Sequence, residues 1–240
     1  MKIIAHRGDS ATHAENTPAS WDSAFEKGAF AIEADIRYSA DGVGICSHDP
    51  TLQRLFGLTD RADALSFGEL SALSTDFGDC VSTFAEVLAY AASGKPVLLD
   101  LKDESPVGLE RLWTDIEGAV PAAVRHLVIA GCHTVEATEF SAAKGSVTIL
   151  GFIPNPDLAL EFHRAGASLI RLWESDVTHE RVAALKAAGA EVWVTTGHHT
   201  TGRKVGDADA ASLEALAEMG VDGVLINDVA LTKSILEALQ

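Results

Sequence analysis

Two histidines and three acids in this chain stand at the ends of predicted β-strands. His6 closes the first predicted strand, and Glu33 and Asp35 lie near the end of the second. His48 follows a short return strand, and Asp100 comes at the end of the third main strand. In an α/β barrel, side chains at the carboxyl ends of the strands meet on one face, which carries the active site. We therefore expect these five residues to form one site.

The acidic residues have the spacing of a cation site. Glu33 and Asp35 are two residues apart on a strand, so their side chains point to the same side. Two neighbouring carboxylates repel each other unless a cation lies between them, and oxygen ligands alone suit Mg²⁺ or Ca²⁺ better than zinc. We predict a divalent metal bound by Glu33, Asp35 and Asp100. The alternative is a pair of solvated acids in a surface bend.

The two histidines are candidates for proton transfer. Imidazole has an ordinary pKa of about 6.5 and both accepts and donates protons near neutrality. A single histidine is more often a hydrogen-bonded structural residue. Because His6 and His48 both stand at strand ends beside acids and a cation, we predict that they are a catalytic acid–base pair.

Two cationic residues accompany these groups. Arg7 presents a planar fork that matches phosphate oxygens, although an ion pair with Glu33 or Asp35 is the alternative role. Lys102 shares its strand face with Asp100 and is either an ion-pair partner or a contact to phosphate or metal-bound oxygen. We predict that both bind substrate. Together with the acids and histidines they are suited to cleaving a phosphodiester.

Other polar and aromatic residues are weaker candidates for the functional site. The adjacent His198 and His199 are typical of a solvated loop, and Asn16-Thr17-Pro18 is typical of a helix start. Trp173 follows the sixth strand and is a candidate for an apolar wall of the pocket. The sequence has no Gly-x-Ser-x-Gly motif, Cys–His nucleophile pair or P-loop, so covalent serine or cysteine hydrolysis and nucleoside triphosphate chemistry lack support.

Composition limits the partners. The formal charge of −17 argues against nucleic acid, which requires a basic face. It also makes local positive groups necessary for a phosphate substrate. No apolar run reaches the roughly 18 residues of a membrane span, so we expect no stable membrane association.

The cysteines and the start of the chain bear on location. Cys46, Cys80 and Cys132 are odd in number and lack metal-type spacing, which is typical of reduced thiols in a cytoplasmic protein. The first predicted strand begins at Ile3, which leaves no room for a cleavable signal peptide. We expect a cytoplasmic protein, with the mature form of a longer secreted precursor as the alternative.

Alternating strand and helix patterns predict the fold. Eight β/α units favour a closed TIM (β/α)8 barrel over an open doubly wound sheet, and no Gly-x-Gly-x-x-Gly follows the first strand. We predict one domain over residues 1–240. A turn at Asp41-Gly42 and a return strand, Val43–Ser47, introduce an irregular insertion of about residues 49–81, which is a candidate cover for the catalytic face. The predicted main strands are Ile3–Ala5, Ala31–Arg37, Val97–Leu101, Leu127–Ala130, Val147–Phe152, Ser168–Leu172, Glu191–Thr195 and Gly223–Ile226.

The pattern as a whole resembles the glycerophosphodiester phosphodiesterase family. The resemblance rests on His6-Arg7-Gly8 followed after six residues by Glu15-Asn16-Thr17, on Glu33-Ala34-Asp35, on Asp41-Gly42 with His48-Asp49, and on Gly220-Val221-Asp222-Gly223. It implies that His6 and His48 are the acid–base pair, that Glu33, Asp35 and Asp100 bind the metal, and that Arg7 and Lys102 lie near the phosphate.

Three positions depart from the family pattern. Ala14 replaces the usual proline, and Asp100 replaces the usual glutamate, which puts metal affinity in question. Thr195-Thr196-Gly197-His198 replaces Trp-Thr-Val-Asn, which suggests a different leaving-group or glycerol pocket.

The resemblance implies metal-dependent hydrolysis of glycerophosphodiesters to glycerol 3-phosphate and an alcohol. The alternatives are a related barrel enzyme for phosphoinositides or sugar phosphodiesters, and a barrel that binds phosphodiesters without cleaving them. The sequence leaves open the alcohol, the choice between Mg²⁺ and Ca²⁺, the oligomeric state, and whether water or a substrate hydroxyl is the nucleophile.

Overall fold

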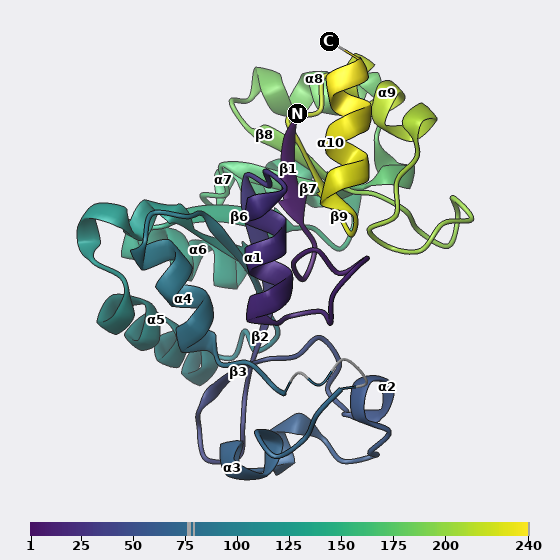
Figure 1. Cartoon of the computed structure of the whole chain (residues 1–240). Coiled ribbons are helices and arrows are strands. Elements are labelled where there is room, and N and C mark those ends of the chain that lie inside the picture. The colour runs from purple at the N-terminus through teal and green to yellow at the C-terminus, as the bar shows by residue number, and fades with distance from the viewer. Residues whose placement is uncertain (76–77, 79, 240) are drawn as a thin grey trace.

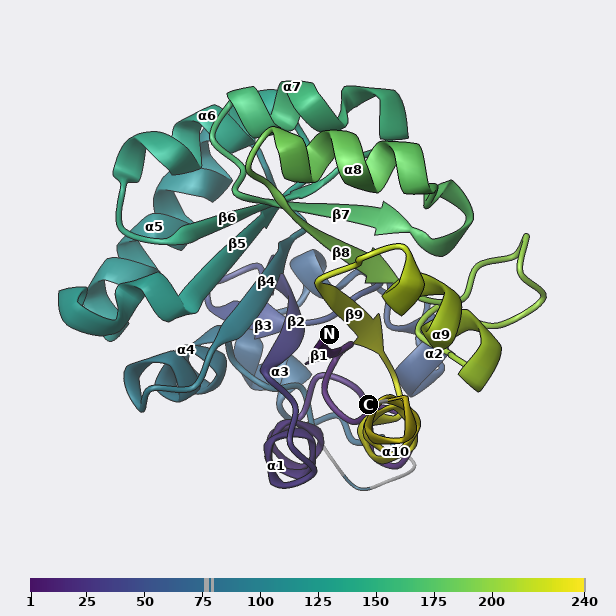
Figure 2. The ribbon, with the colours of Figure 1, turned by 90° about the horizontal axis from the view of Figure 1, so that it is seen from above.

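The computed structural model describes residues 1–75, 78 and 80–239. Within these residues, parallel strands follow each other around a ring in the order β1-β9-β8-β7-β6-β5-β4-β2, and pairing of β1 with β2 closes it (Figure 2). The predicted TIM barrel is confirmed. Its strands are β1 (Lys2–Ala5), β2 (Ala31–Tyr38), β4 (Val97–Leu101), β5 (Val128–Cys132), β6 (Thr148–Phe152), β7 (Leu169–Trp173), β8 (Glu191–Thr195) and β9 (Gly223–Ile226).

Helices surround the strands on the outside of the barrel (Figure 2). The main helices are α1 (Pro18–Glu26), α4 (Phe84–Ala92), α5 (Pro106–Ala119), α6 (Val135–Lys144), α7 (Ala159–Arg164), α8 (His179–Ala187), α9 (Ala210–Glu218) and α10 (Val229–Ala238). Short 3₁₀ segments join some of them: η2 (Ala122–Leu127), η3 (Pro156–Leu158) and η4 (Glu174–Asp176). None of the helices among the described residues is both long and apolar enough to cross a membrane.

Strand alternation decides which side chains face the barrel axis. On β2, Ile32, Ala34 and Ile36 belong to the core between strands and helices. Ala31, at the start of the same strand, belongs to the separate cluster inside the barrel. Because side chains alternate along a strand, Glu33 and Asp35 share the inner side with Ala31. Both acids are thereby directed into the barrel, as the sequence predicts.

The helix boundaries follow local sequence signals. Thr17 caps α1 with a reciprocal bond to Ser20, and Pro18 occupies the first turn, so the predicted helix start at this point is confirmed. Five glycines that lie just after the ends of helices all have positive φ, a conformation that glycine adopts without a Cβ clash. They are Gly28, Gly94, Gly166, Gly189 and Gly220.

The insertion after β2 is a small folded unit of its own. Its strand β3 (Gly44–Cys46) pairs antiparallel with β2, which confirms the predicted return strand. The short elements α2 (Gln53–Phe56), η1 (Ala62–Ala64) and α3 (Phe67–Leu70) follow, at the end of the barrel where β1 and β9 terminate (Figure 1).

A separate apolar cluster holds the insertion together. Leu70 is buried in it, and Phe56, Leu65, Phe67 and Leu73 pack against it. Leu58, which follows the left-handed Gly57 at the end of α2, has an exposed side chain. Residues 76, 77 and 79 of the expected insertion lie outside the described residues.

One inner position of the barrel is restricted to glycine by its neighbour. A Cβ added to Gly131 on β5 would lie 2.2 Å from Cε2 of Phe152 and 2.8 Å from the carbonyl oxygen of Leu99. The Phe152 ring therefore lies directly over the backbone of β5. This contact fixes the ring in the wall of the cavity described below.

We predict that Gly131→Ala lowers the free energy of unfolding by about 1–3 kcal/mol, because the new methyl group displaces the ring. Urea denaturation measures the change. Gly118 on α5 has no atom within 4 Å of an added Cβ, so Gly118→Ala is the matched control and should be neutral or stabilising by about 0.5–1 kcal/mol. Equal stability of the two variants would contradict this packing.

Candidate active site

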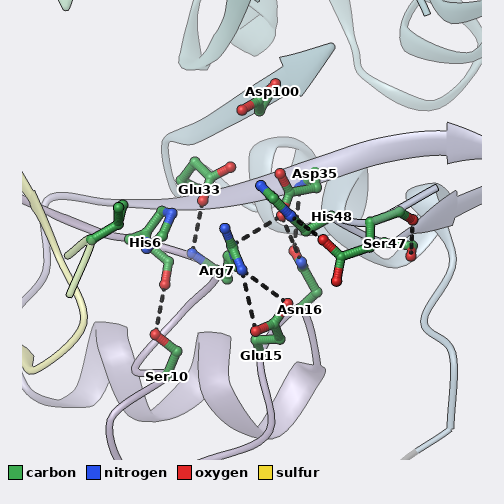
Figure 3. Close-up of polar contacts among 12 residues, drawn as sticks. His6, Arg7, Ser10, Glu15, Asn16, Glu33, Asp35, Ser47, His48 and Asp100 are labelled. Carbon is green, nitrogen blue, oxygen red and sulfur yellow. Dashed lines mark hydrogen bonds and ion pairs between the residues drawn. The ribbon is translucent and has the colours of Figure 1, made fainter. Parts of the chain in front are cut away.

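The predicted site residues come together at the carboxyl ends of the barrel strands. A cavity of about 280 Å³ opens there, and six of the seven predicted residues line it: His6, Arg7, Glu33, His48, Asp100 and Lys102. The seventh, Asp35, is fully buried beside them. Figure 3 shows most of this set converging from β1, β2, β4 and the segment after β3. A second cavity, of about 650 Å³, shares His6 and Arg7 with the first.

The three acids form a cluster that fits a metal ion. Oxygen atoms of Glu33, Asp35 and Asp100 lie within 4.8 Å of one another. Burial raises the pKa of Glu33 well above its ordinary value, and the negative charges of Asp35 and Asp100 raise it further. Such a cluster favours either a proton or a cation at Glu33. Three convergent carboxylates with this excess of negative charge match the oxygen ligands of a hard divalent ion.

Asp35 is held ionised by its neighbours. Burial alone would raise its pKa, but the net direction is downward because cations surround it. Lys102 Nζ lies 2.9 Å from Oδ1, and Arg7 Nε lies 3.3 Å from Oδ2. Asn16 adds a hydrogen bond of 2.9 Å from its amide nitrogen to Oδ2, and its amide oxygen accepts the backbone N–H of Asp35 at 3.2 Å. Asn16, which the sequence indicated only as part of a helix start, therefore positions a predicted ligand.

Asp100 has two partners of its own. Lys102 Nζ is 2.8 Å from Oδ2, and Nε2 of His133 is 2.8 Å from Oδ1. These partners overcome the effect of burial and lower the pKa of Asp100. Lys102 thus bridges the carboxylates of Asp35 and Asp100, so its alternative role as an ion-pair partner is present in the structure. His133 was not singled out from the sequence, although it directly follows β5 and so stands on the catalytic face.

The His-Arg-Gly segment makes a tight turn after β1. Arg7 has a φ of 58°, and its backbone N–H donates to Oε2 of Glu33 at 2.8 Å. Gly8 has a φ of 82°, and a Cβ there would lie 2.2 Å from the hydroxyl oxygen of Ser20. The Arg7 guanidinium contacts Glu15 at 3.1 Å as well as Asp35 (Figure 3). Its predicted contact with substrate stays a prediction.

The hydrogen bonds of Asn227 settle the tautomer of His6. The amide nitrogen of Asn227 donates to the carbonyl oxygen of Val205 at 2.8 Å and to Asp207 at 3.0 Å. Its amide oxygen therefore faces His6 and lies 2.9 Å from Nδ1. Nδ1 must carry the proton in this bond, which leaves Nε2 as a free acceptor. Burial, and then the nearby charge of Arg7, lower the pKa of His6 to about 4.

His48 is oriented differently. Its Nδ1 is 2.8 Å from Oδ1 of Asp49, whose other oxygen accepts from Nε of Arg54 at 2.5 Å. The Arg37 guanidinium donates to the carbonyl oxygen of His48 at 2.9 Å. Arg54 also contacts Glu15 at 2.7 Å, which ties the insertion to the loop after β1. A carboxylate oxygen therefore holds Nδ1 of His48, whereas an amide oxygen holds Nδ1 of His6.

Aromatic and cationic residues complete the cavity on its far side. Trp173 lines it, as the sequence suggested for a pocket wall, and Phe152 and Arg171 lie next to it. The ring of His198 stacks on Trp173 with centroids 5.1 Å apart, whereas the neighbouring His199 is exposed. Phe152 and Arg171 were not identified from the sequence, because both lie within apolar strands whose inner and outer faces the sequence does not distinguish.

The chain matches a known protein family over almost its entire length. The sequence profile of the glycerophosphoryl diester phosphodiesterase family matches residues 6–231. The chain belongs to this family. The resemblance inferred from the sequence is therefore confirmed, and His6 and Arg7 of the family's opening motif line the cavity described above.

Individual relatives match a shorter part of the chain. Human glycerophosphodiester phosphodiesterase 1 is 38% identical over 74 residues, which are 31% of this chain and 22% of the human protein. The glycerophosphodiester phosphodiesterase of Caldanaerobacter subterraneus is 46% identical over 52 residues, 22% of this chain and 21% of that protein. Each match thus spans about a fifth of the relative's length.

Solved structures of family members share the fold. An Oleispira antarctica phosphodiesterase in complex with the product sn-glycerol-3-phosphate has a TM-score of 0.84 at 19% identity, with 99% of this chain and 97% of that chain covered. A glycerophosphodiester phosphodiesterase from Agrobacterium tumefaciens has a TM-score of 0.77 at 23% identity, with 99% of both chains covered. At these identities the likeness establishes the barrel.

We predict that His6 remains neutral to unusually low pH. Its imidazole resonances in the metal-free protein should titrate near pH 4, and His6→Gln assigns them. The pKa in the folded protein lies below the value of about 6.5 in the unfolded chain, so the unfolded state takes up the proton first as pH falls. Stability from the neutral ring is complete above pH 6.5 and declines toward pH 4, and His6→Gln should lack this decline. A midpoint near 6.5 would contradict the assigned environment.

Proposed function

We propose that the protein hydrolyses glycerophosphodiesters to glycerol 3-phosphate and an alcohol. The observation that carries this proposal is the neutral His6, with its free Nε2 in a cavity that also contains His48 and the acidic cluster. Family membership supports the reaction class. The Oleispira antarctica relative, which binds sn-glycerol-3-phosphate as product, supports the substrate class.

The two histidines divide the proton transfers in this proposal. His6 accepts the proton of the attacking hydroxyl at Nε2, because Nδ1 is already occupied by its bond to Asn227. His48 donates a proton from Nε2 to the leaving alkoxide, while Asp49 holds Nδ1. The attacking oxygen bonds to phosphorus as the bond to the alcohol oxygen breaks. This step leaves His6 protonated and His48 neutral, and proton exchange with solvent after product release returns both rings to their starting states.

Glu33, Asp35 and Asp100 would hold a divalent cation, and we propose Mg²⁺ or Ca²⁺ because the ligands are all carboxylates. When bound, such an ion supplies positive charge to phosphoryl oxygens and lowers the pKa of a coordinated hydroxyl. We further propose that Lys102 and Arg7 exchange part of their present ion pairs for contacts with the phosphate.

The remaining partners and the location are part of the same proposal. A small-molecule phosphodiester fits a cavity of about 280 Å³, and a charge of −17 opposes binding to nucleic acid. Cys46, Cys80 and Cys132 are all free thiols. A cytoplasmic location agrees with free thiols, because reducing compartments keep them so.

A coupled assay for glycerol 3-phosphate over a panel of glycerophosphodiesters tests the activity. We expect turnover that EDTA abolishes and that Mg²⁺ or Ca²⁺ restores. Glu33→Gln should weaken metal binding strongly, because it removes a charge from the cluster, with little change in fold because the amide oxygen can still accept from Arg7. Glu110→Gln, at an exposed ion pair with Lys144, is the matched control.

Two results would reject this assignment. Full activity of Glu33→Gln in the presence of chelator would reject the assignment of the three acids as a metal site. Binding of the whole panel without release of glycerol 3-phosphate would favour a non-catalytic phosphodiester-binding barrel.

The roles of the histidines are separable by leaving group. We predict that His6→Ala and His48→Ala each lower kcat by about 10²–10⁴ on alkyl glycerophosphodiesters. A phenolate leaving group needs little protonation, so His48→Ala should recover much of its rate on such a substrate, whereas His6→Ala should not. The exposed His126, just before β5 at the other end of the barrel, provides the control His126→Ala. Equal losses on both substrates would reject the division of roles.

A further inference from the structure

Arg171 is a buried cation in the wall of the cavity. It lies on β7 with only 6% of its surface exposed, and its side chain lines the same cavity as Glu33 and Asp100. In the ring order, β7 stands directly across from β2, with β4, β5 and β6 between them on one side and β8, β9 and β1 on the other. Arg171 therefore faces the strand that carries Glu33 from the opposite side of the barrel.

The guanidinium of Arg171 has no polar partner within the described part of the chain. Its Nε and Nη1 are both buried without a hydrogen bond, and no ion pair involves it. The other two cationic side chains of this cavity are occupied, since Arg7 pairs with Glu15 and Lys102 with two carboxylates. Burying unpaired charged donors costs several kcal/mol, so an arrangement of this kind calls for an acceptor.

Aromatic rings flank this guanidinium. Its central carbon lies 4.8 Å from the centroid of the Phe152 ring and 4.0 Å from that of Trp173. Next to these, His133 stacks on Phe152 at 5.0 Å, and the ring of His198 lies tilted against Trp173 at 5.1 Å. The rings leave the guanidinium no polar partner among the described residues, and its N–H groups donate to a ligand in the plane of the group. This geometry suits a bidentate contact to an oxyanion.

The group remains a cation at neutral pH. Burial lowers the pKa of Arg171 to about 10, while the charges of Asp100, Asp176 and Glu33 act in the opposite direction. A permanently charged, rigid and unpaired fork at the inner end of a phosphodiester cavity is a ready site for phosphoryl oxygens. In a protein with no anionic ligand, the same unpaired guanidinium would lower the stability of the fold.

We propose that Arg171 binds the phosphoryl group of the substrate and product through its in-plane N–H groups, from the wall opposite the carboxylate cluster. This inference rests on the proposed function for the identity of the ligand, a phosphate ester. In this arrangement Arg171 supplies positive charge on the side of the phosphoryl group that faces away from the carboxylate cluster. Arg171 is thus a substrate-binding residue that the family motifs at β1, β2 and β4 do not include.

The test is phosphate binding by Arg171→Met, which keeps the length of the side chain and its contact with the rings. Isothermal titration with glycerol 3-phosphate and with inorganic phosphate, in the presence of Mg²⁺, should show affinity about 10- to 100-fold weaker than that of the wild type. Arg171→Lys should be intermediate, because it restores charge without the fork. Arg125 donates only to backbone carbonyl groups of Val120 and Glu117, so Arg125→Met is the control for the lost charge.

Thermal stability separates binding from a structural role. If the guanidinium serves a ligand, Arg171→Met should melt at the same temperature as the wild type or higher, because an apolar chain replaces an unpaired buried charge. Phosphate should raise the melting temperature of the wild type more than that of the variant. A variant that melts earlier and binds phosphate normally would overturn the proposal.

A measurement on the unmodified protein does not depend on how the variants fold. The Nε–Hε resonance of Arg171, assigned through Arg171→Lys or through its contacts to the Phe152 and Trp173 rings, should shift on titration with phosphate but not with chloride. An unmoved resonance at saturating phosphate would overturn the proposal. If the wild type binds phosphate through Arg171 yet releases glycerol 3-phosphate from no substrate in the panel, the proposed function fails and the binding site stands.

Discussion

The repulsion between buried carboxylates is the constraint on which the rest of this site depends. Oxygen atoms of Glu33, Asp35 and Asp100 lie within 4.8 Å of one another in the mouth of the barrel, where Glu33 and Asp35 are buried and Asp100 is half-buried. Each acid is therefore matched by a donor or cation. Backbone N–H of Arg7 serves Glu33, while the ammonium of Lys102 lies between the other two. Burial raises the pKa of Glu33, and the charges of Asp35 and Asp100 raise it further, which is the physical reason the cluster suits a divalent ion.

The same constraint explains local details of the chain. Arg7 adopts a left-handed backbone conformation, which aims its N–H at Glu33, and Gly8 follows because a side chain there would collide with Ser20. His133 contacts Asp100, the predicted ligand that is one methylene shorter than the usual glutamate of the family. An imidazole and an ammonium hold this shorter acid in place.

The two histidines differ because their neighbours differ. His6 is held at Nδ1 by the amide oxygen of Asn227, while burial and the nearby charge of Arg7 lower its pKa and keep the ring neutral. His48 lies near the surface beside the carboxylate of Asp49. The proposed base and acid are thus distinguished by burial and by the charge of one partner. Arg171 adds a third kind of environment, a charged group that is buried without any partner among the described residues.

The sequence by itself determined the barrel and which of the predicted acid–base and metal residues meet at one end of it. Alternating strand and helix patterns recur along the chain, and residues two apart on a strand share a side, so the placement of Glu33 and Asp35 followed from spacing alone. The sequence also predicted where the insertion lies. Leu58, one of the apolar residues of the insertion, is nevertheless exposed. Only the tertiary structure decided the partners of these groups. Asn227 reaches His6 and Arg171 faces Glu33 across the barrel because closure of the ring joins distant strands, and local sequence contains no record of which strands become neighbours.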